Sequence, residues 1–332
     1  MSQHHGTTEF ERQIRSQPDQ LDHMLSDGRL RQQVHAAAEG LHRVRRIWVV
    51  GTGSSQHAAA LGAAMLQDAG RSAHAVSSMQ FVRNAPIVGP HDGVVVITHS
   101  GETAYALAAR ALAFTAGLQT ITICRKGVSM NDLVETVERD GSETVSIAFT
   151  SALFALGMIA AQMGADSITP DKLALVPGSV RNAVEAPGVE QIPVPARLLA
   201  VIGAGPAAVT AQEGSLKVRE ASRCLSQGYD AEYFLHGSAV PLGSQDHLVV
   251  LTTPDEDGLV EAIATTAEAA KIGVSRIGEP SPLPTVLAQI PLTARLQLLA
   301  LRFAHAKGQN PDKVIVGRWD DEGLWRIGAP SA

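Results

Sequence analysis

The amino-acid sequence predicts an α/β protein with two similar parallel sheets, each flanked by helices. Short apolar runs rich in β-branched residues alternate with longer runs rich in alanine and leucine, as in residues 94–112, "VVVITHSGETAYALAARAL". The chain of 332 residues, 45% of them hydrophobic, is long enough for two domains with substantial cores. The third observation is an internal repeat.

The repeat consists of three ordered matches, each offset by 151 to 154 residues. "RRIWVVGTG" is echoed by "ARLLAVIGAG", "DGVVVITHSGET" by "DHLVVLTTPDED", and "GLQTITICRKG" by "AAKIGVSRIG". Strands that alternate with helices form parallel sheets with helices on both faces, so each copy predicts a three-layer αβα, flavodoxin-like unit. We predict an N-terminal helical segment at 1–28, a first domain at 29–178, a second at 179–318 and a C-terminal tail at 319–332.

Charge and composition narrow the class of ligand. The net charge of −6 argues against a nucleic-acid or anionic-membrane partner and requires any anionic ligand to be bound by local groups. Cys124 and Cys224 fit no metal-ligand spacing, so we expect no metal. We see no signal peptide or membrane span and expect a cytoplasmic protein.

Two junctions between a strand and a helix carry hydroxyl groups. "GTGSS" at 51–55 and "THSGET" at 98–103 each follow a buried strand and precede a helix. Backbone N–H groups at a helix N-terminus attract anions, and ligands of parallel sheets bind at the carboxyl ends of strands. These loops therefore predict a phosphate cradle, unless the hydroxyls merely cap their helices. The second copy has Thr252, Pro254, Asp255 and Asp257 instead, and its aspartates would repel a phosphate.

These motifs resemble the sugar isomerase (SIS) domain family. "AQEGSLKVREASRCLSQGYDAEYFLHGSAVPL" resembles the isomerase half of glucosamine-6-phosphate synthase, and "QIRSQPDQL" and "LQLLALRFAHAKGQNPD" also look like that family. The resemblance implies two tandem SIS domains. It also implies that one sugar phosphate is bound by Gly53, Ser54, Ser55, Thr98, His99, Ser100, Thr103, Thr150 and Ser151.

The same resemblance assigns catalytic roles in the second copy. Glu213, Lys217 and Glu220 share one helical face, a pattern that on a solvated helix is an ordinary salt-bridge stripe. By resemblance Glu220 moves a proton between C1 and C2 of an open-chain sugar, and Lys217 holds and tunes it. His236 would open the sugar ring in the partner subunit's site, which implies a homodimer with shared active sites. No cofactor is required.

Departures from the synthase shape the expected reaction. The chain begins "MSQHHG", has no cysteine before Cys124, and lacks the tail lysine motif, although Lys313 and Arg318 are nearby. His99 replaces the synthase glutamine, and Thr150-Ser151 resembles the deaminase/isomerase members. We therefore expect a 2-amino-2-deoxyhexose 6-phosphate (glucosamine- or galactosamine-6-phosphate-like) to become a ketose 6-phosphate plus ammonia. An aldose–ketose isomerase, a fructosamine-phosphate deglycase and a non-catalytic sugar-phosphate-binding protein are the alternatives.

Overall fold

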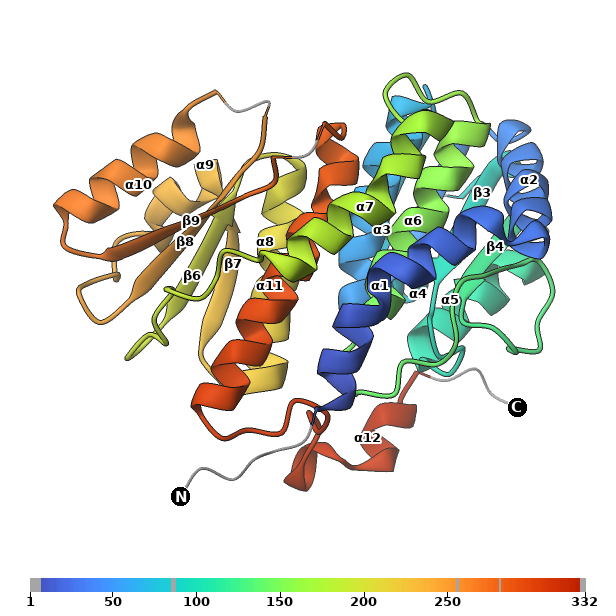
Figure 1. Ribbon diagram of the computed structural model, residues 1–332. Coiled ribbons are helices and arrows are strands. Elements are labelled where there is room, and N and C mark those ends of the chain that lie inside the picture. Colours follow the sequence, from blue (N-terminus) through green and yellow to red (C-terminus); the bar gives the residue numbers. More distant parts are fainter. Residues whose placement is uncertain (1–6, 85–87, 255–256, 281, 329–332) are drawn as a thin grey trace. The chain divides into compact units, whose positions relative to one another are not determined.

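The computed structural model describes residues 7–84, 88–254, 257–280 and 282–328 (Figure 1). It divides into two compact units, each containing one sheet. The first-sheet unit consists of Asp19–Arg139, Ile147–Leu175 and Ile315–Ala332, and the second-sheet unit of Met1–Pro18, Asp140–Ser146 and Val176–Val314. We describe each unit by itself.

The two units do not correspond to continuous halves of the chain, unlike the segments proposed from the sequence. The division runs through helices α1 (Glu9–Ser26) and α7 (Pro170–Glu185), at Pro18 in the first and next to Pro177 in the second. Proline removes a backbone hydrogen bond from a helix interior, so both helices are weakened where the units divide. The first part of α1 is tied into the second-sheet unit, because the Glu9 N–H donates to Asp312 and Gln17 donates to Gln297.

The first sheet is parallel and has the strand order β2-β1-β3-β4-β5. Its strands are β1 (Arg46–Gly51), β2 (Ser72–Ser77), β3 (Asp92–Ile97), β4 (Gln119–Cys124) and β5 (Leu133–Glu135). This is the flavodoxin-like order, in which the chain direction across the sheet reverses between β1 and β3. Every residue of β3 is buried, as expected for the central strand of a sheet covered on both faces.

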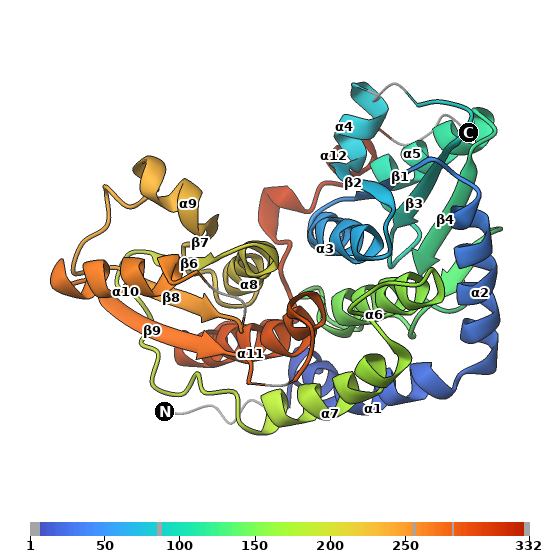
Figure 2. The same ribbon diagram turned by 90° about the horizontal axis from the view of Figure 1, so that it is seen from above.

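Helices cover both faces of the first sheet (Figure 2). On one face α4 (Ser78–Arg83) and α5 (Ala104–Thr115) enclose a core that contains Phe81, Val94 and Val96. The other helices of this unit are α2 (Gly28–His42), α3 (Ser54–Asp68) and α6 (Ile147–Gln162), which pack against β1, β2, β4 and β5 and against one another. The unit also holds the C-terminal turns η2 (Gly317–Trp319) and α12 (Glu322–Arg326).

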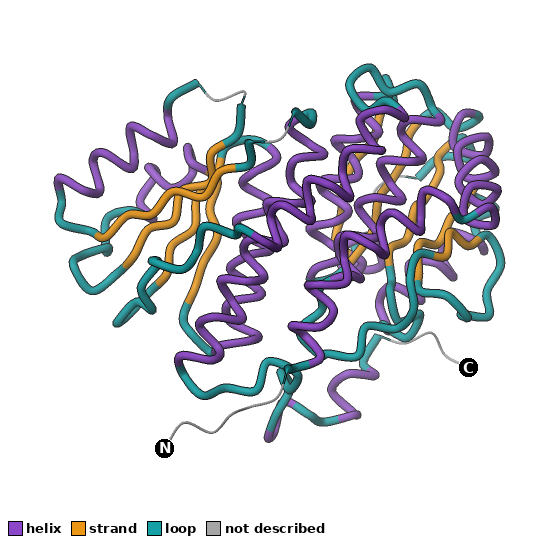
Figure 3. The backbone as a smooth tube through the Cα atoms, viewed as in Figure 1, coloured by secondary structure: helices purple, strands orange, loops and turns teal. Residues whose placement is uncertain are grey.

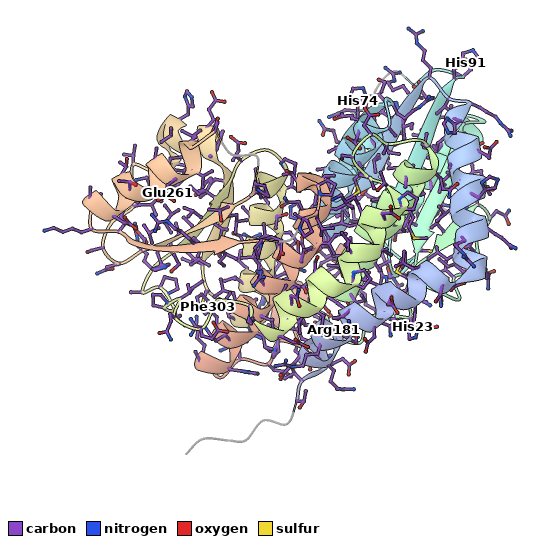
Figure 4. The ribbon with its side chains drawn as sticks, turned by 45° about the horizontal axis from the view of Figure 1, so that its top comes forward. His23, His74, His91, Arg181, Glu261 and Phe303 are labelled. Atoms are coloured by element: carbon purple, nitrogen blue, oxygen red, sulfur yellow. The ribbon has the colours of Figure 1, made fainter. Side chains whose placement is uncertain are left out.

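The second sheet has the order β7-β6-β8-β9 and is also parallel (Figure 3). Its strands are β6 (Leu199–Gly203), β7 (Ser226–Asp230), β8 (His247–Thr252) and β9 (Gly273–Gly278). Helix α10 (Leu259–Ala269) covers one face, and α8 (Pro206–Ser222) and α11 (Thr285–Ala306) pack together in the same unit. Glu261 on α10, labelled in Figure 4, bonds Arg276 of β9. Between β7 and β8 lie α9 (Ala231–Tyr233) and the irregular turn η1 (Phe234–Ser238).

The repeated G-x-G motif has the same geometry in both units. A Cβ on Gly51 would lie 2.1 Å from the backbone carbonyl oxygen of Ser55, and one on Gly203 would lie 2.5 Å from the carbonyl carbon of Ala207. Only glycine therefore lets each strand turn so closely into its helix. The second glycine has φ 59°, ψ −130° at Gly53 and φ 54°, ψ −127° at Gly205. The sequence repeat therefore reflects a repeated backbone turn.

A second repeated feature is an arginine–aspartate clasp at the start of the strands. Asp92 of β3 accepts hydrogen bonds from Arg46 (Nη2 to Oδ2, 2.7 Å) and from the Gly89 N–H (3.0 Å). Asp246, just before β8, is bonded in the same way by Arg197 and by the Gly243 N–H (2.8 Å). In both units the clasp ties the loop before the central strand to the neighbouring strand.

Candidate active site

The hydroxyl-rich loops predicted from the sequence lie at the carboxyl ends of β1 and β3. These strands are hydrogen-bonded neighbours, and the direction of the strand order reverses between them. Ligands of open parallel sheets bind outside the strand ends at this position, because the two loops diverge there and leave a crevice. The structure thus brings residues 51–55 and 98–103 to one place in the first-sheet unit.

The hydroxyl groups of the loop at residues 98–103 do not cap helix α5. Thr103 occupies the N-cap position of α5 but makes no side-chain hydrogen bond to the helix. Thr98 is 2% exposed, and its Oγ1 has no hydrogen-bond partner among the described residues. Only the Ser100 hydroxyl has a local role, since it accepts the Glu102 N–H at 3.1 Å. A buried hydroxyl without a partner is costly, so Thr98 favours a ligand here over capping alone.

A third strand end contributes hydroxyls that the sequence analysis missed. β2 ends at Ser77, which caps α4 by accepting the Gln80 N–H, and the next residue, Ser78, is fully buried and bonded to the Thr52 hydroxyl. β2 is the other neighbour of β1. The paired serines in "AVSSMQ" were the available signal, but their proximity to Thr52 depends on the strand order.

His99 is a neutral donor or acceptor in this loop. Burial lowers its pKa to about 4, and the charges of Arg125 and Arg139 add to this effect. Arg125 follows β4, and its backbone N–H donates to the His99 carbonyl oxygen at 3.0 Å. The sequence analysis did not select either arginine, because neither is near the loop along the chain.

Thr150 and Ser151 lie inside α6 rather than in a loop. Both are fully buried, and their hydroxyls donate to the carbonyl oxygens of Ile147 and Ala148, three residues earlier in the same helix. These bonds satisfy the hydroxyls without a ligand. Their role in substrate binding stays a prediction.

In the second-sheet unit, α8 carries a buried ionic cluster. Glu213 and Lys217 have fully buried side chains, and that of Glu220 is 20% exposed. Lys217 Nζ lies 3.5 Å from Glu213 Oε1 and 2.5 Å from Glu220 Oε2. The alternative of a solvated salt-bridge stripe is therefore excluded. A fully buried lysine is tolerated because both of its neighbours are carboxylates.

The cluster gives Glu220 the electrostatics of a general base. Burial raises the pKa of Glu220, and this outweighs the lowering by Lys217. Burial alone would lower the pKa of Lys217, but Glu220 and Glu213 raise it above its usual value, so the lysine stays protonated. A carboxylate with a raised pKa that is held by a fixed ammonium group can accept a proton near neutral pH.

Asp140 is a member of this cluster that the sequence analysis did not find. It is buried, its negative charge adds to the raised pKa of Lys217, and its Oδ2 accepts the Ser146 N–H at 2.8 Å. The segment Asp140–Ser146 belongs to the second-sheet unit although it precedes α6 in the chain. No sequence pattern relates it to α8.

His236 lies in η1 and is exposed. Its neighbours Tyr233, Leu235 and Val240 are exposed by 65%, 54% and 83%. The carboxylate Glu232 is exposed as well. Lys313, considered as a replacement for the tail lysine, bonds Glu143 at 3.0 Å, while Arg318 lies in η2.

Two features of the described residues bear on the class of site. No group of three or more His, Cys, Asp or Glu side chains there is arranged to hold a metal ion. Within the same residues, no helix has the length and apolarity needed to cross a membrane.

The first-sheet unit is a parallel α/β unit with hydroxyl-rich loops at its strand ends, and comparisons show which proteins the chain is similar to. The SIS domain model matches residues 40–162, in agreement with the similarity that the sequence motifs indicated. Glutamine–fructose-6-phosphate aminotransferase (isomerizing) of Bacteroides thetaiotaomicron is 27% identical over 313 residues, covering 83% of this chain and 51% of that protein. The chain spans about half the length of this relative, and the match corresponds to its isomerase domain.

Solved structures share the fold. Glucosamine-6-phosphate deaminase from Thermotoga maritima superposes with a TM-score of 0.79 at 16% identity, covering 92% of this chain and 97% of that one. Tagatose-6-phosphate ketose/aldose isomerase from Escherichia coli gives 0.80 at 19% identity, with coverage of 94% and 98%. At these identities the likeness concerns the fold.

The prediction of two tandem SIS domains needs correction. The family match supports one SIS domain, and relatives of similar architecture superpose with nearly the whole chain as one structure. The sequence repeat identified two parallel sheets correctly. Within the described residues the second sheet has no counterpart of β5, and the sequence after β8 does not repeat the hydroxyl pattern of residues 98–103. A repeated backbone is therefore not evidence for a repeated functional domain.

Proposed function

We propose that this protein removes the amino group of a 2-amino-2-deoxyhexose 6-phosphate and releases a ketose 6-phosphate and ammonia. The observation that carries the proposal is the buried Glu213–Lys217–Glu220 cluster, in which a carboxylate of raised pKa is held by a protonated lysine. Such a group is suited to proton transfer at carbon. The similarity to aminotransferases of fructose 6-phosphate and the shared fold with a glucosamine-6-phosphate deaminase support the substrate class.

In the proposed reaction, the hydroxyl loops of the first-sheet unit bind the phosphate, and His236 moves the proton of the anomeric hydroxyl so that the ring opens. Glu220 removes the C2 proton of the open-chain aldehyde, giving an enol that bears the amino group. Protonation at C1 then yields a C2 imine, and water hydrolyses it to the ketose and ammonia. Lys217 stays protonated throughout and holds Glu220 in position.

We further propose that the protein is a homodimer in which His236 serves the partner's substrate. The exposed side chains of Tyr233, Leu235 and Val240 around His236 support this, since large apolar side chains gathered in one segment are typical of an interface. Sedimentation at micromolar concentration is expected to give a dimer. A purely monomeric protein would remove the shared-site proposal but leave the phosphate loop and the cluster unaffected.

The second candidate is an aldose–ketose isomerase that acts on a hexose 6-phosphate, supported by the shared fold with a tagatose-6-phosphate isomerase. The same Glu220 would move the same proton, and no bond to nitrogen would break. An ammonia-release assay against hexosamine 6-phosphates, fructosamine 6-phosphate and hexose 6-phosphates separates the candidates. We expect one ammonia per ketose from a hexosamine 6-phosphate and none from the unphosphorylated aminosugar. Ketose formation from a hexose 6-phosphate without ammonia would favour the isomerase.

A further inference from the structure

Two arginines share one carboxylate beside the hydroxyl loop of the first-sheet unit. Glu102, within the loop, places its Oε1 3.4 Å from Arg139 Nη1 and 4.0 Å from Arg125 Nη2. Two guanidinium groups facing one carboxylate leave a net charge of +1. Because the low pKa of His99 keeps that side chain neutral, the arginines are the positive groups at this loop, in a chain whose net charge is −6.

Arg125 is held firmly against the loop. Its backbone N–H donates to the His99 carbonyl oxygen at 3.0 Å, and its Nη1 donates to the Lys126 carbonyl oxygen at 3.0 Å. Its side chain is 21% exposed, compared with 62% for Arg139. Arg125 Nε is buried and has no hydrogen-bond partner in the part of the chain that the structure describes. A guanidinium in this position retains donor capacity and is screened less by salt than an exposed one.

The next segment of chain fixes the loop from the same side. Val128 Cγ1 lies 3.0 Å from the position that a Cβ on Gly101 would take, and Met130 lies 3.5 Å from it. Gly101 has φ 72°, and its N–H donates to the Thr98 carbonyl oxygen at 3.2 Å. The turn that carries Glu102 is thus packed against the segment that follows Arg125, which holds the backbones of these two residues close together.

We propose that Arg125, assisted by Arg139, makes the hydroxyl loop selective for a doubly charged phosphate monoester, and that Glu102 is the internal counter-ion that limits this affinity. Hydroxyls, backbone N–H groups and a neutral histidine bind an anion through dipoles alone. A half-buried guanidinium adds a full charge, and its interaction with a ligand doubles when the ligand charge doubles. This inference rests on the proposed function for the location of the phosphate, and it identifies specificity-determining residues of that site.

The test measures binding without turnover. Inorganic phosphate and the non-isomerising sorbitol 6-phosphate are titrated into the full-length protein by calorimetry at low and moderate ionic strength. We expect Arg125→Ala to weaken sorbitol 6-phosphate at least about tenfold, the scale of one hydrogen bond to a charged group, and Arg139→Ala to have a smaller effect. Arg125→Lys should retain part of the affinity, because the charge remains while the fork of donors is lost.

Glu102→Gln provides the result that misfolding cannot mimic. Removing the internal counter-ion is expected to tighten sorbitol 6-phosphate several-fold and to steepen the dependence of binding on salt. Matched controls are Glu39→Gln on α2 and Arg43→Ala at the residue that follows α2. The two side chains form an exposed pair 3.9 Å apart that precedes β1 and so lies toward the opposite ends of the strands. These variants should leave binding unchanged.

The outcomes separate this inference from the proposed reaction. Unchanged or weaker binding by Glu102→Gln, or unchanged binding by Arg125→Ala, would overturn the inference, as would a wild-type protein that binds neither phosphate compound. If wild-type protein binds sorbitol 6-phosphate with the expected order of variants yet turns over no hexosamine or hexose 6-phosphate, the inference stands and the proposed reaction fails.

Discussion

The two units use the same scaffold and differ at the carboxyl ends of their central strands. Strand order, the G-x-G turn and the arginine–aspartate clasp recur in both. After β3, Thr103 stands at the N-terminus of α5 without capping it, whereas after β8 the Asp257 carboxylate accepts the N–H of Leu259, the first residue of α10, at 2.9 Å. Asp255, in the loop that follows β8, lies outside the described residues. A carboxylate of the chain itself thus caps the helix after the central strand in the second-sheet unit, whereas no side chain of the N-cap residue caps the equivalent helix in the first-sheet unit.

The units also differ in where they bury charge. The second-sheet unit buries an ionic cluster on α8, the helix that follows its G-x-G turn, whereas the equivalent helix α3 of the first-sheet unit buries alanine, leucine and methionine. A buried cluster costs desolvation energy that an apolar helix does not, so its presence in one copy points to function rather than to folding. Features that recur in both units, such as the G-x-G turn, are those that the fold requires. The buried ionic cluster, which α3 does not share, is a feature that one unit has gained.

The largest expected effect comes from removing the proposed base. Glu220→Gln keeps the shape of the side chain, and we expect kcat to fall by roughly two to four orders of magnitude, the usual contribution of a positioned base. Binding of sorbitol 6-phosphate should be nearly unchanged, because the phosphate loop is intact. Steady-state kinetics and calorimetry on the same protein measure both.

Two neighbouring carboxylates serve as controls for this variant. Glu232→Gln changes an exposed residue and should leave turnover near normal, and Glu213→Gln should mainly reduce stability or positioning, because it removes one of the two partners of Lys217. Near-normal turnover by Glu220→Gln together with an inactive Glu232→Gln would mean that the wrong carboxylate was chosen. If neither variant affected turnover, the sugar-phosphate-binding protein without catalysis would become the leading interpretation.

The clasps test whether the shared scaffold is equally important in both units. Asp92→Ala and Asp246→Ala each remove the carboxylate that accepts from an arginine and from a backbone N–H, and each is expected to lower the free energy of unfolding by about 2 kcal/mol. Urea denaturation of the two variants and the parent measures this. If only one of the two variants had a lower free energy of unfolding, the clasp would stabilise one unit and not the other, although its geometry is the same in both.

The clasps also predict an acid dependence. Burial raises the pKa of Asp92, but the hydrogen bonds from Arg46 and the Gly89 N–H lower it by more, so its pKa is below the ordinary value. The pKa of Asp246 is also lowered, mainly by the hydrogen bond from Arg197. A carboxyl group whose pKa is lowered by folding stabilises the protein fully above its ordinary pKa of about 4. This contribution is lost as the pH falls through the lower pKa of the folded state, and each alanine variant should lack its share.

The hydroxyl loops offer a smaller and more specific contrast. Ser100→Ala removes a hydroxyl beside the proposed phosphate, and we expect KM for the sugar phosphate to rise about tenfold with little change in kcat. Ser100 corresponds to Pro254 in the other unit, so the control there is Thr252→Ala, which removes a hydroxyl at the end of β8 and should leave KM unchanged. Crystals grown with phosphate or sulfate are expected to show the anion at residues 98–103. Density only beside Pro254 would contradict the assignment.

The sequence predicted the features that depend on local pattern. Buried strands, the turns at Gly51 and Gly203 and the helix carrying Glu213, Lys217 and Glu220 follow from hydrophobic runs, glycines and helical spacing. Arg125, Ser78 and Asp140 could not be found in this way. The first two reach the site through strand neighbours, and Asp140 reaches α8 by long-range packing. The spacing of Glu213 and Lys217 was equally compatible with a solvated stripe, and only their complete burial decided between the two interpretations.

The smallest expected effect concerns His99. Burial lowers its pKa to about 4, whereas the unfolded chain has an ordinary histidine pKa of about 6.5. Between these values the unfolded state binds a proton that the folded state does not, so His99 destabilises the protein progressively as the pH falls from about 6.5 toward 4. His99→Gln removes this titration. Its loss of thermal stability over that pH window should therefore be shallower than that of the parent, while the two proteins should respond alike between pH 7 and 8.

His247 of β8 provides the comparison in the other unit, since burial lowers its pKa too and its ring bonds Ser275 at 2.9 Å. His247→Gln should also make the loss of thermal stability at acidic pH shallower than in the parent. Only the His99 variant should change the affinity for sorbitol 6-phosphate, because His99 follows the end of β3, whereas His247 lies at the start of the equivalent strand β8. Melting curves across the pH range, with and without sorbitol 6-phosphate, measure both effects. Equal changes in affinity for the two variants would mean that His99 has only a structural role in its loop.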